Sequence, residues 1–585
     1  MPAWKHLCVS LLAVLVIAGA GPAWGQYTTQ TLTLKPGWNA VFLNVQPVQN
    51  GCEEVFADVP VSSVWSWVRR FEPTQFVRDP TELVPRMPDW LVYYPKDHPQ
   101  AFLSDLHAIH GGRAYLIDFA GDAPLTLTLE GKAVVRDVKW VPNSFNLVGF
   151  HLAADAAPTF KRFFEGDPAL ADGQVFKTSP AGRSVAVIDP AGEALRQGEA
   201  YWVYCTGEST FNGPLTVDVD ARDGIEFGEQ LNEHLVRFAN HARQEKTVTI
   251  SVVPTERPTA LASKAVLPDL GGGVALSYKR LLAWQPFEEP ITFTMAPGSE
   301  RGLQLAVRRA DMALPATPDA LYESLLRVED SDGGLYYVPV TAARTSTPGG
   351  LWVGTVTIDA VSEASNPEDS VTPQATGTEF RFRLILHVDD TGQNAHLLSE
   401  VTLLQVQPVL EDDPDNPGQS IETEPGRYVL ITDDSLIPEY SGASVRGDDI
   451  VGRRISSPNF AFDLPLPQLP MAGSIQSALE GVATMGYDSP LNPFVHRFHP
   501  DHNNLDERYD TMLDEGKESF SFTRDIRLEF SEEDPEELGV PAWGYDLIGG
   551  TYRETMLGVH QNDIHVQGRF RLNKVVDVSV LNDGR

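Results

Sequence analysis

Short runs in which apolar residues alternate with polar ones recur along the whole chain, separated by turns rich in Gly and Pro. Residues 28–34 show this alternation near the start, and residues 564–572 show it near the end. A period of two is typical of β-strands with one buried and one solvated face. Residues 51–56 and 160–164 instead predict short helices. We therefore expect an all-β dominated chain of several tandem β-sandwich or small β-domains with few short helices.

One series of strand and turn signals occurs twice in the first third of the chain. The first copy opens at Gly37-Trp38-Asn39 and later reaches Gly112-Arg113-Ala114-Tyr115. The second opens at Phe145-Asn146 and later reaches Gly198-Glu199-Ala200-Tyr201-Trp202-Val203. Each copy also contains a predicted short helix, a central strand and a final Leu-Thr strand, in the same order. These landmarks predict two β modules, residues 26–132 and 133–222, the second a repeat of the first.

The two modules resemble the Gly-Trp-Asn β-modules found in many secreted bacterial proteins. Those modules typically open with a Gly-Trp-Asn strand and close with a Gly-x-x-Tyr-Trp-Val strand, and each signature is intact in one copy here. The resemblance covers about residues 27–220. It implies an extracellular β-fold without catalytic residues, and it suggests that Trp38 and Trp202 are core aromatics.

The next blocks differ in pattern from the modules. Residues 223–312 combine alternating strands with Pro-Gly turns, which predicts an immunoglobulin-like sandwich. This block resembles the hydin and major-sperm-protein type, whose members are usually scaffolds or adaptors. Residues 313–408 predict another β domain, with a hairpin that turns at Ser331–Gly334.

The rest of the chain predicts an acidic Pro-rich linker at 409–427 and a C-terminal β domain with a His-rich loop at 428–585. The acidic residues of the linker are conceivable calcium ligands, but the regular ligand spacing of an EF-hand is absent there, which favours a solvated acidic loop. The later blocks together resemble large uncharacterised secreted bacterial β-rich proteins, a likeness that implies no activity.

The first 25 residues have the features of a secretory signal. Lys5 precedes an apolar run, Leu7–Ala20, and small residues lead to an expected cleavage after Gly25. The alternative is a retained membrane anchor, but the run is short for a span. No later stretch is long and apolar enough to cross a bilayer. We expect a secreted protein, located outside the cell, in the periplasm or at the cell surface.

Acidic residues outnumber basic residues by 80 to 45, which gives a formal net charge of −35. Such a surface repels phosphate backbones and anionic lipids, so binding to nucleic acid is not expected.

Cys52 and Cys205 remain after signal cleavage, one in each module. A disulfide between them is one hypothesis, since an oxidising compartment permits it. Two buried free thiols are the alternative.

A dense cluster of imidazoles makes residues 492–504 the strongest candidate site. His496, His499 and His502 recur at every third position, with Asp501 between them. Imidazole and carboxylate are common ligands of zinc and similar divalent ions, so a Zn or Ca site is one hypothesis, with His560 or His565 as a further ligand. The spacing matches no metalloprotease helix. The alternative is a polar loop without metal.

Aromatic residues gather in an insertion of the first module, at about residues 68–108. Trp90, Tyr93 and Tyr94 are candidates for a sugar-stacking platform on a loop. The alternative is that these three side chains cap the core of their own module, because aromatic residues are more often interior than ligand-facing.

The sequence contains no phosphate-binding Gly loop and no Gly-x-Ser-x-Gly nucleophile motif. We therefore expect a non-catalytic scaffold or adhesion-like protein that needs no cofactor and binds an extracellular polymer or a cell-surface protein. The alternatives are a metal-binding protein or metal-dependent hydrolase centred on residues 496–502, and a carbohydrate-binding protein.

Overall fold

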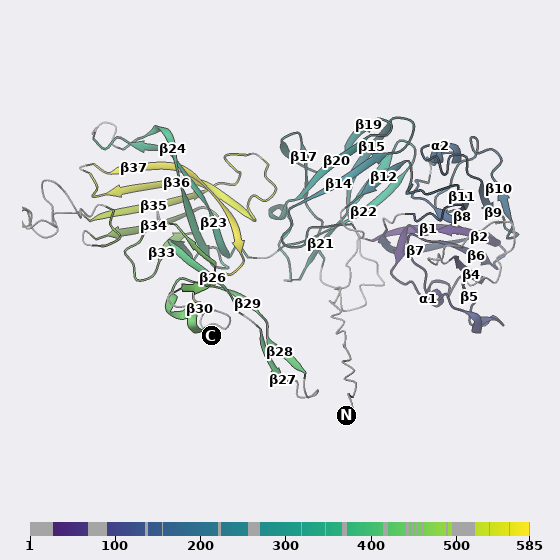
Figure 1. Cartoon of the computed structure of the whole chain (residues 1–585), viewed down its shortest axis with the longest axis horizontal. Helices are drawn as coiled ribbons and strands as arrows, with labels where there is room; N and C mark the ends of the chain where they lie inside the picture. Colours follow the sequence, from purple (N-terminus) through teal and green to yellow (C-terminus); the bar gives the residue numbers. More distant parts are fainter. Residues whose placement is uncertain are drawn as a thin grey trace, which may run out of the picture. The chain divides into compact units, whose positions relative to one another are not determined.

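Figure 1 shows the computed structural model of the chain, in which strands dominate as expected. The structure describes residues 27–583, except for 68–89, 135–137, 155, 220–223, 255–269, 318, 345–346, 366–370, 407, 413–418, 440–443, 447–448, 452, 458–460, 487–488, 494–520, 538 and 561. The expected signal peptide therefore lies outside the described residues. Among the helices that the structure describes, none is long and apolar enough to span a membrane.

The chain divides into two compact units. The first runs to Leu276 and adds Phe287–Leu305 and Pro315–Arg344. The second consists of Ser277–Pro286, Ala306–Leu314 and Thr345–Arg585.

The first unit begins with two sheets and one short helix. Sheet order β1-β7-β3 joins the first and last strands, and β2-β6-β4-β5 forms the second sheet. In β1 the buried positions alternate with exposed ones, as the sequence predicts, and Leu32 and Leu34 enter the core. The elements are β1 (Tyr27–Leu34), β2 (Gly37–Phe42), β3 (Val45–Pro47), α1 (Cys52–Val55), β4 (Val61–Trp67), β5 (Trp90–Tyr93), η1 (Ala101–Leu103), β6 (Ala114–Phe119) and β7 (Leu125–Ala133).

The next stretch of chain forms a four-stranded sheet with the order β10-β9-β11-β8. Helix α2 covers the residues that the sequence predicts as helix, and its three phenylalanines are buried. Thr159 caps it by accepting a hydrogen bond from the backbone N–H of Arg162. The elements are β8 (Ser144–Gly149), α2 (Phe160–Phe164), β9 (Val175–Thr178), β10 (Ser184–Ala186) and β11 (Ala200–Cys205).

Corresponding residues of these two stretches make matching hydrogen bonds. The Asn39 side chain accepts from the N–H of Lys35 and donates to the carbonyls of Lys35 and Gly37. Asn146 accepts from the N–H of Val141 and donates to the carbonyls of Val141 and Ser144. Each Asn therefore pins the turn that leads into its own strand.

Sheet β2-β6-β4-β5 and sheet β10-β9-β11-β8 share an aromatic core. The backbone N–H of Phe42 donates to the carbonyl of Gly198, and the N–H of Trp38 donates to the carbonyl of Pro180. Trp202 is buried in this shared core, and Trp38 packs against it while partly exposed.

Strands from Leu215 onward build two sheets in the first unit. Strands β12 (Leu215–Asp218), β14 (Glu233–Asn240) and β20 (Glu300–Val307) are neighbours in one, and the other has the order β13-β22-β21-β15-β19. Phe238 of β14 contacts Phe293 of β19, with ring centroids 5.5 Å apart, so the two sheets pack together. The second sheet consists of β13 (Ile225–Glu226), β15 (Lys246–Pro254), β19 (Ile291–Met295), β21 (Leu321–Asp330) and β22 (Leu335–Ala343), and β16 (Leu270–Gly272) pairs with β21.

The hairpin β21–β22 turns where the sequence predicts, and the N–H of Asp330 donates to the carbonyl of Gly334. The hairpin differs from expectation in its partners. The sequence predicts a separate domain at 313–408 for this hairpin, whereas in the structure Ile250 of β15 pairs with Val328 of β21 in one continuous sheet. Pairing between strands so far apart in sequence is invisible to a local pattern.

The second unit centres on a closed barrel with the order β23-β24-β25-β33-β34-β35-β36-β37. All neighbouring pairs are antiparallel, and β37 pairs back with β23. The barrel therefore takes strands from both sides of the expected linker at 409–427. Its strands are β23 (Gly350–Ser362), β24 (Pro373–Val388), β25 (Ala395–Leu398), β33 (Gln468–Gly473), β34 (Ala478–Met485), β35 (Phe522–Phe530), β36 (Leu547–Leu557) and β37 (Ile564–Val576).

Smaller elements complete the second unit. A three-stranded sheet has the order β29-β26-β32, and β27 and β28 form an exposed hairpin beside the acidic stretch. These elements, with two further hairpins and two 3₁₀ helices, are β17 (Leu276–Arg280), β18 (Ala283–Pro286), η2 (Arg309–Asp311), β26 (Glu400–Val406), β27 (Val409–Asp412), β28 (Ser420–Glu424), β29 (Arg427–Ile431), η3 (Asp434–Glu439), β30 (Ser444–Arg446), β31 (Asp449–Val451) and β32 (Arg453–Ser456).

Candidate functional site

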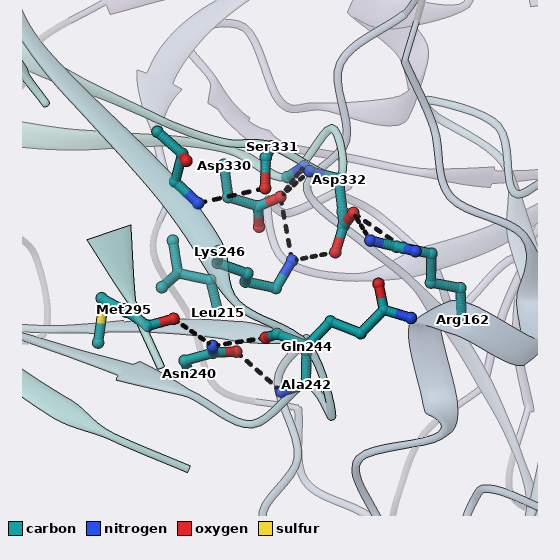
Figure 2. Close-up of polar contacts among 12 residues, drawn as sticks. Arg162, Leu215, Asn240, Ala242, Gln244, Lys246, Met295, Asp330, Ser331 and Asp332 are labelled. Carbon is teal, nitrogen blue, oxygen red and sulfur yellow. Dashed lines mark hydrogen bonds and ion pairs between the residues drawn. The ribbon is translucent and has the colours of Figure 1, made fainter. Parts of the chain in front are cut away.

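A buried lysine lies at the centre of a charge cluster in the first unit (Figure 2). Lys246 begins β15, and its side chain has no solvent exposure. Its Nζ lies 2.6 Å from Asp332 Oδ2 and 3.2 Å from Asp330 Oδ1. Burying an ammonium group is costly unless it is paired, and here both carboxylates compensate it.

Arg162 of α2 completes the cluster from the other side of Asp332. Its Nε lies 2.8 Å and its Nη2 2.6 Å from Asp332 Oδ1, so the guanidinium and Lys246 share one carboxylate. Burial acts to raise the pKa of Asp332, but hydrogen bonds from Arg162 and Lys246 outweigh it and hold the pKa below its ordinary value. Two cations and two carboxylates balance the charge.

The turn of hairpin β21–β22 presents these carboxylates. Asp330 Oδ1 accepts hydrogen bonds from the N–H groups of Asp332, at 2.7 Å, and Gly334, at 3.2 Å. Gly333 has φ +84°, and a Cβ there would lie 1.9 Å from the carbonyl oxygen of Ala156. Only glycine therefore lets the turn approach the segment that leads into α2.

A cavity of about 340 Å³ adjoins this turn. Asp330 lies beside it and is buried, and its Oδ2 has no hydrogen-bond partner among the described residues. The other lining residues are Ala153, Ala156, Thr247, Thr249, Glu329, Ser331, Gly333 and Gly334.

Asn240 organises the chain below the cluster (Figure 2). Its amide nitrogen donates to the carbonyls of Gln244, Met295 and Ala296, and its oxygen accepts from the N–H of Ala242. The side chain thereby ties the turn before β15 to the end of β19. Together the ion pairs of Lys246 and Arg162 join α2, the hairpin turn and β15, and we call this arrangement the junction.

A second group of buried charges lies inside the barrel. Arg524 Nε lies 2.5 Å from Glu554 Oε1, and Arg524 Nη2 lies 3.2 Å from Glu554 Oε2. The hydroxyl of Tyr552 donates to Glu554 Oε2 at 2.6 Å. Burial and then the Glu554 charge raise the pKa of Tyr552, so its hydroxyl keeps its proton.

The imidazole cluster at His496, His499 and His502, with Asp501, lies outside the described residues, so the metal hypothesis stays a prediction. Two further histidines named with it are described. His565 Nδ1 lies 3.2 Å from the hydroxyl of Thr555, and His560 is exposed on a turn. Among the residues that the structure describes, no group of three or more His, Cys, Asp or Glu could hold a metal ion.

The three candidate stacking residues do not share one face. Tyr93 is buried in the core that β1, α1 and β4 enclose, and its ring stacks on Phe56 with centroids 6.0 Å apart. Trp90 packs instead into the aromatic core that sheets β2-β6-β4-β5 and β10-β9-β11-β8 share, and its ring centroid lies 6.1 Å from that of Trp202. The Tyr94 ring stacks on the imidazole of His98, with ring centroids 4.7 Å apart.

The two cysteines are free thiols, each fully buried in a different core cluster. The disulfide between Cys52 and Cys205 is thus not formed in this structure. Burial raises the pKa of the Cys52 thiol to about 12, which keeps it protonated and unreactive. The two thiols act here as small apolar core groups.

The local sequence pattern does not predict the charged residues of either cluster. One signal was present: Arg524 and Glu554 occupy inward positions of alternating strands, where neighbours such as Ile526 are apolar. For Lys246 no local signal existed, since its partner Asp332 lies 86 residues away.

Comparisons with known proteins assign no family. No protein-family model matches the chain, and no curated protein matches it. Among solved structures, the class 5 fimbriae chaperone CfaA matches at 11% identity and a TM-score of 0.14, covering 37% of this chain and 98% of that one. A Bacteroides ovatus protein of unknown function matches at 11% identity and a TM-score of 0.15, covering 62% of this chain and 94% of that one. TM-scores this low carry no argument about the fold or the function of this chain.

Proposed function

We propose that this chain is an exported, multidomain binding or structural protein of the scaffold or adhesion type, acting without catalysis. Its partner is an extracellular polymer or a cell-surface protein. The observation that carries the proposal is the junction at Lys246, where buried charges are neutralised by one another and join separate segments. Groups engaged in this way stabilise geometry and are poorly placed for proton transfer.

The matched hydrogen bonds of Asn39 and Asn146 support a second part of the proposal. We infer that residues 26–132 and 133–222 are two copies of one module. Equivalent tyrosines support it as well: the hydroxyl of Tyr115 accepts from the N–H of His110, and that of Tyr201 accepts from the N–H of Arg196. Two modules fastened through a shared core hold their outer surfaces at a fixed spacing, which favours binding to an extended partner.

Sedimentation with cell-envelope fractions and insoluble polysaccharides tests the binding role. We expect saturable co-sedimentation, with no release of soluble sugars or peptides when zinc or calcium is added. A matched sample of the heat-unfolded chain controls for nonspecific adsorption. Turnover of a glycan or peptide that one point substitution abolishes would contradict the absence of catalysis, and no saturable binding to any fraction would contradict the binding role.

A further inference from the structure

A wide bulge shapes one end of the barrel. Ile358 of β23 pairs with Phe380 of β24, but the next pair is Ala360 with Ala375. Residues 376–379 therefore stand opposite Asp359 alone. Bulges at barrel rims bend the strand and redirect its side chains. Here the bulge carries Thr376 and Thr378 to the border of a cavity.

The cavity lies where β23 and β36 end and where β24, β35 and β37 begin. Its volume is about 370 Å³, within the range of small-molecule pockets, roughly 300–1,000 Å³. The interior of an eight-stranded barrel is wide enough for side chains or for one small ligand. The lining is mostly apolar and consists of Ile358, Val361, Thr376, Thr378, Phe380, Phe382, Arg524, Glu554, Met556 and Val566.

Two phenylalanines lie on the same face of β24, one exposed to solvent and the next buried in the barrel. Phe382 is 9% exposed and belongs to the barrel core, whereas Phe380 is 56% exposed. Their ring centroids lie 6.0 Å apart. The Phe380 ring is exposed to water beside an apolar cavity. A ligand that covered this ring would remove apolar surface from water, which favours binding.

Ion pairs of Arg569 hold the bulge beside the cavity in place. Arg569 Nη2 lies 2.7 Å from Glu379 in the bulge, and its Nη1 lies 3.1 Å from Asp359 opposite. Its Nε lies 2.6 Å from Glu536. These contacts fix both sides of the bulge, so a ligand need not order them on binding.

The polar end of the cavity selects the charge of the ligand. Arg524 and Glu554 neutralise each other, and their side chains are 14% and 6% exposed. A charged ligand would add an uncompensated charge to this low-dielectric site. A hydroxyl or carbonyl oxygen instead accepts a hydrogen bond from the guanidinium at much smaller cost, and a hydroxyl also donates one to the carboxylate.

We propose that this end of the barrel, which we call the barrel pocket, binds a small uncharged molecule that is mostly apolar and carries one hydroxyl or carbonyl group. The barrel pocket is independent of the scaffold role, since a chain that binds no surface can still hold a ligand here.

Fluorescence of N-phenylnaphthylamine, a neutral probe that brightens in apolar sites, tests the proposal on the full chain. We expect saturable binding of one probe per chain and displacement by decanol. Decanoate and decylamine have the same chain length but carry a charge, and we expect each to displace the probe about tenfold less well. Absence of saturable binding would overturn the proposal that the barrel pocket binds a ligand. Equal displacement by decanol, decanoate and decylamine would overturn the proposal that the ligand is uncharged.

Substitutions test whether the probe binds in the barrel pocket. Val361→Trp places an indole in the cavity, and we expect it to weaken probe binding by about tenfold or more. Val482→Trp is the matched control, because Val482 is 59% exposed on β34 and does not line the cavity. Its binding should equal that of the unmodified chain.

Phe380→Ser guards against a folding defect in the first variant. Phe380 is largely exposed, so the substitution should leave the midpoint of thermal unfolding unchanged. The affinity for the probe should fall several-fold. Unaltered probe affinity in both Val361→Trp and Phe380→Ser would overturn the proposal.

Discussion

Lys246 Nζ lies 2.6 Å from Asp332 Oδ2 in a site where the lysine side chain has no solvent exposure. Removing the cation leaves Asp330 and Asp332 to share Arg162 alone. Because an uncompensated buried charge is expensive, Lys246→Met should lower the free energy of unfolding by about 3–5 kcal/mol. Urea denaturation followed by intrinsic fluorescence measures the loss.

Lys96→Met is the matched control for that substitution. Lys96 Nζ lies 2.7 Å from Glu53, but both side chains are largely exposed. Exposed pairs are screened by solvent, so the denaturation midpoint should not move. Equal effects of the two substitutions would contradict the role that we assign to burial.

His387 makes stability depend on pH. It is 3% exposed, and its Nε2 lies 3.1 Å from the carbonyl oxygen of Val578. Burial lowers its pKa from 6.5 to about 4, although the bond to Val578 acts to raise it. Between these pH values the unfolded chain binds a proton that the folded chain does not.

The contribution of this histidine is therefore fully present above pH 6.5 and declines as pH falls toward 4, by about 3 kcal/mol over the window. Denaturant midpoints measured across that range should fall less steeply in His387→Asn than in the unmodified chain. Parallel pH profiles would show that His387 does not titrate in this way.

Gly149 of β8 has no room for a side chain. A Cβ there would lie 2.2 Å from the Cβ of Phe42 in β2. Gly149→Val should therefore push the two sheets apart and cost roughly 1–3 kcal/mol of stability. Gly207→Val is the control, because no described atom lies within 4 Å of a Cβ at that position. Thermal unfolding compares the two, and a larger loss at Gly207 would refute the packing argument.

The buried thiols should be silent in the native protein. Cys52 and Cys205 are fully buried, and burial raises the pKa of each thiol. A chain that starts at Gln26 should give no reaction with a thiol-specific disulfide reagent when native. In denaturant without reductant it should give two thiols per chain. No thiols in denaturant would restore the disulfide between these residues.

Local patterns are enough to predict most of the strands named in the sequence analysis. The alternation of buried and exposed residues in β1 and the helix α2 both depend on neighbours within a few residues. The local sequence is therefore sufficient to predict them. The same local signals predict the hairpin turn at Ser331–Gly334. It could not say that Tyr93 faces one core and Trp90 another, because the facing cores belong to other segments.

The sequence by itself determined that this chain is built from β-strands, since a period of two is a property of each strand alone. Only the tertiary structure decided that β23 closes on β37, that β21 joins the sheet of β15, and that Lys246 meets Asp332. The physical reason is that a strand's hydrogen-bonding edge accepts many partners, and a buried charge can be neutralised from anywhere in the chain. Those choices depend on how the whole fold excludes water.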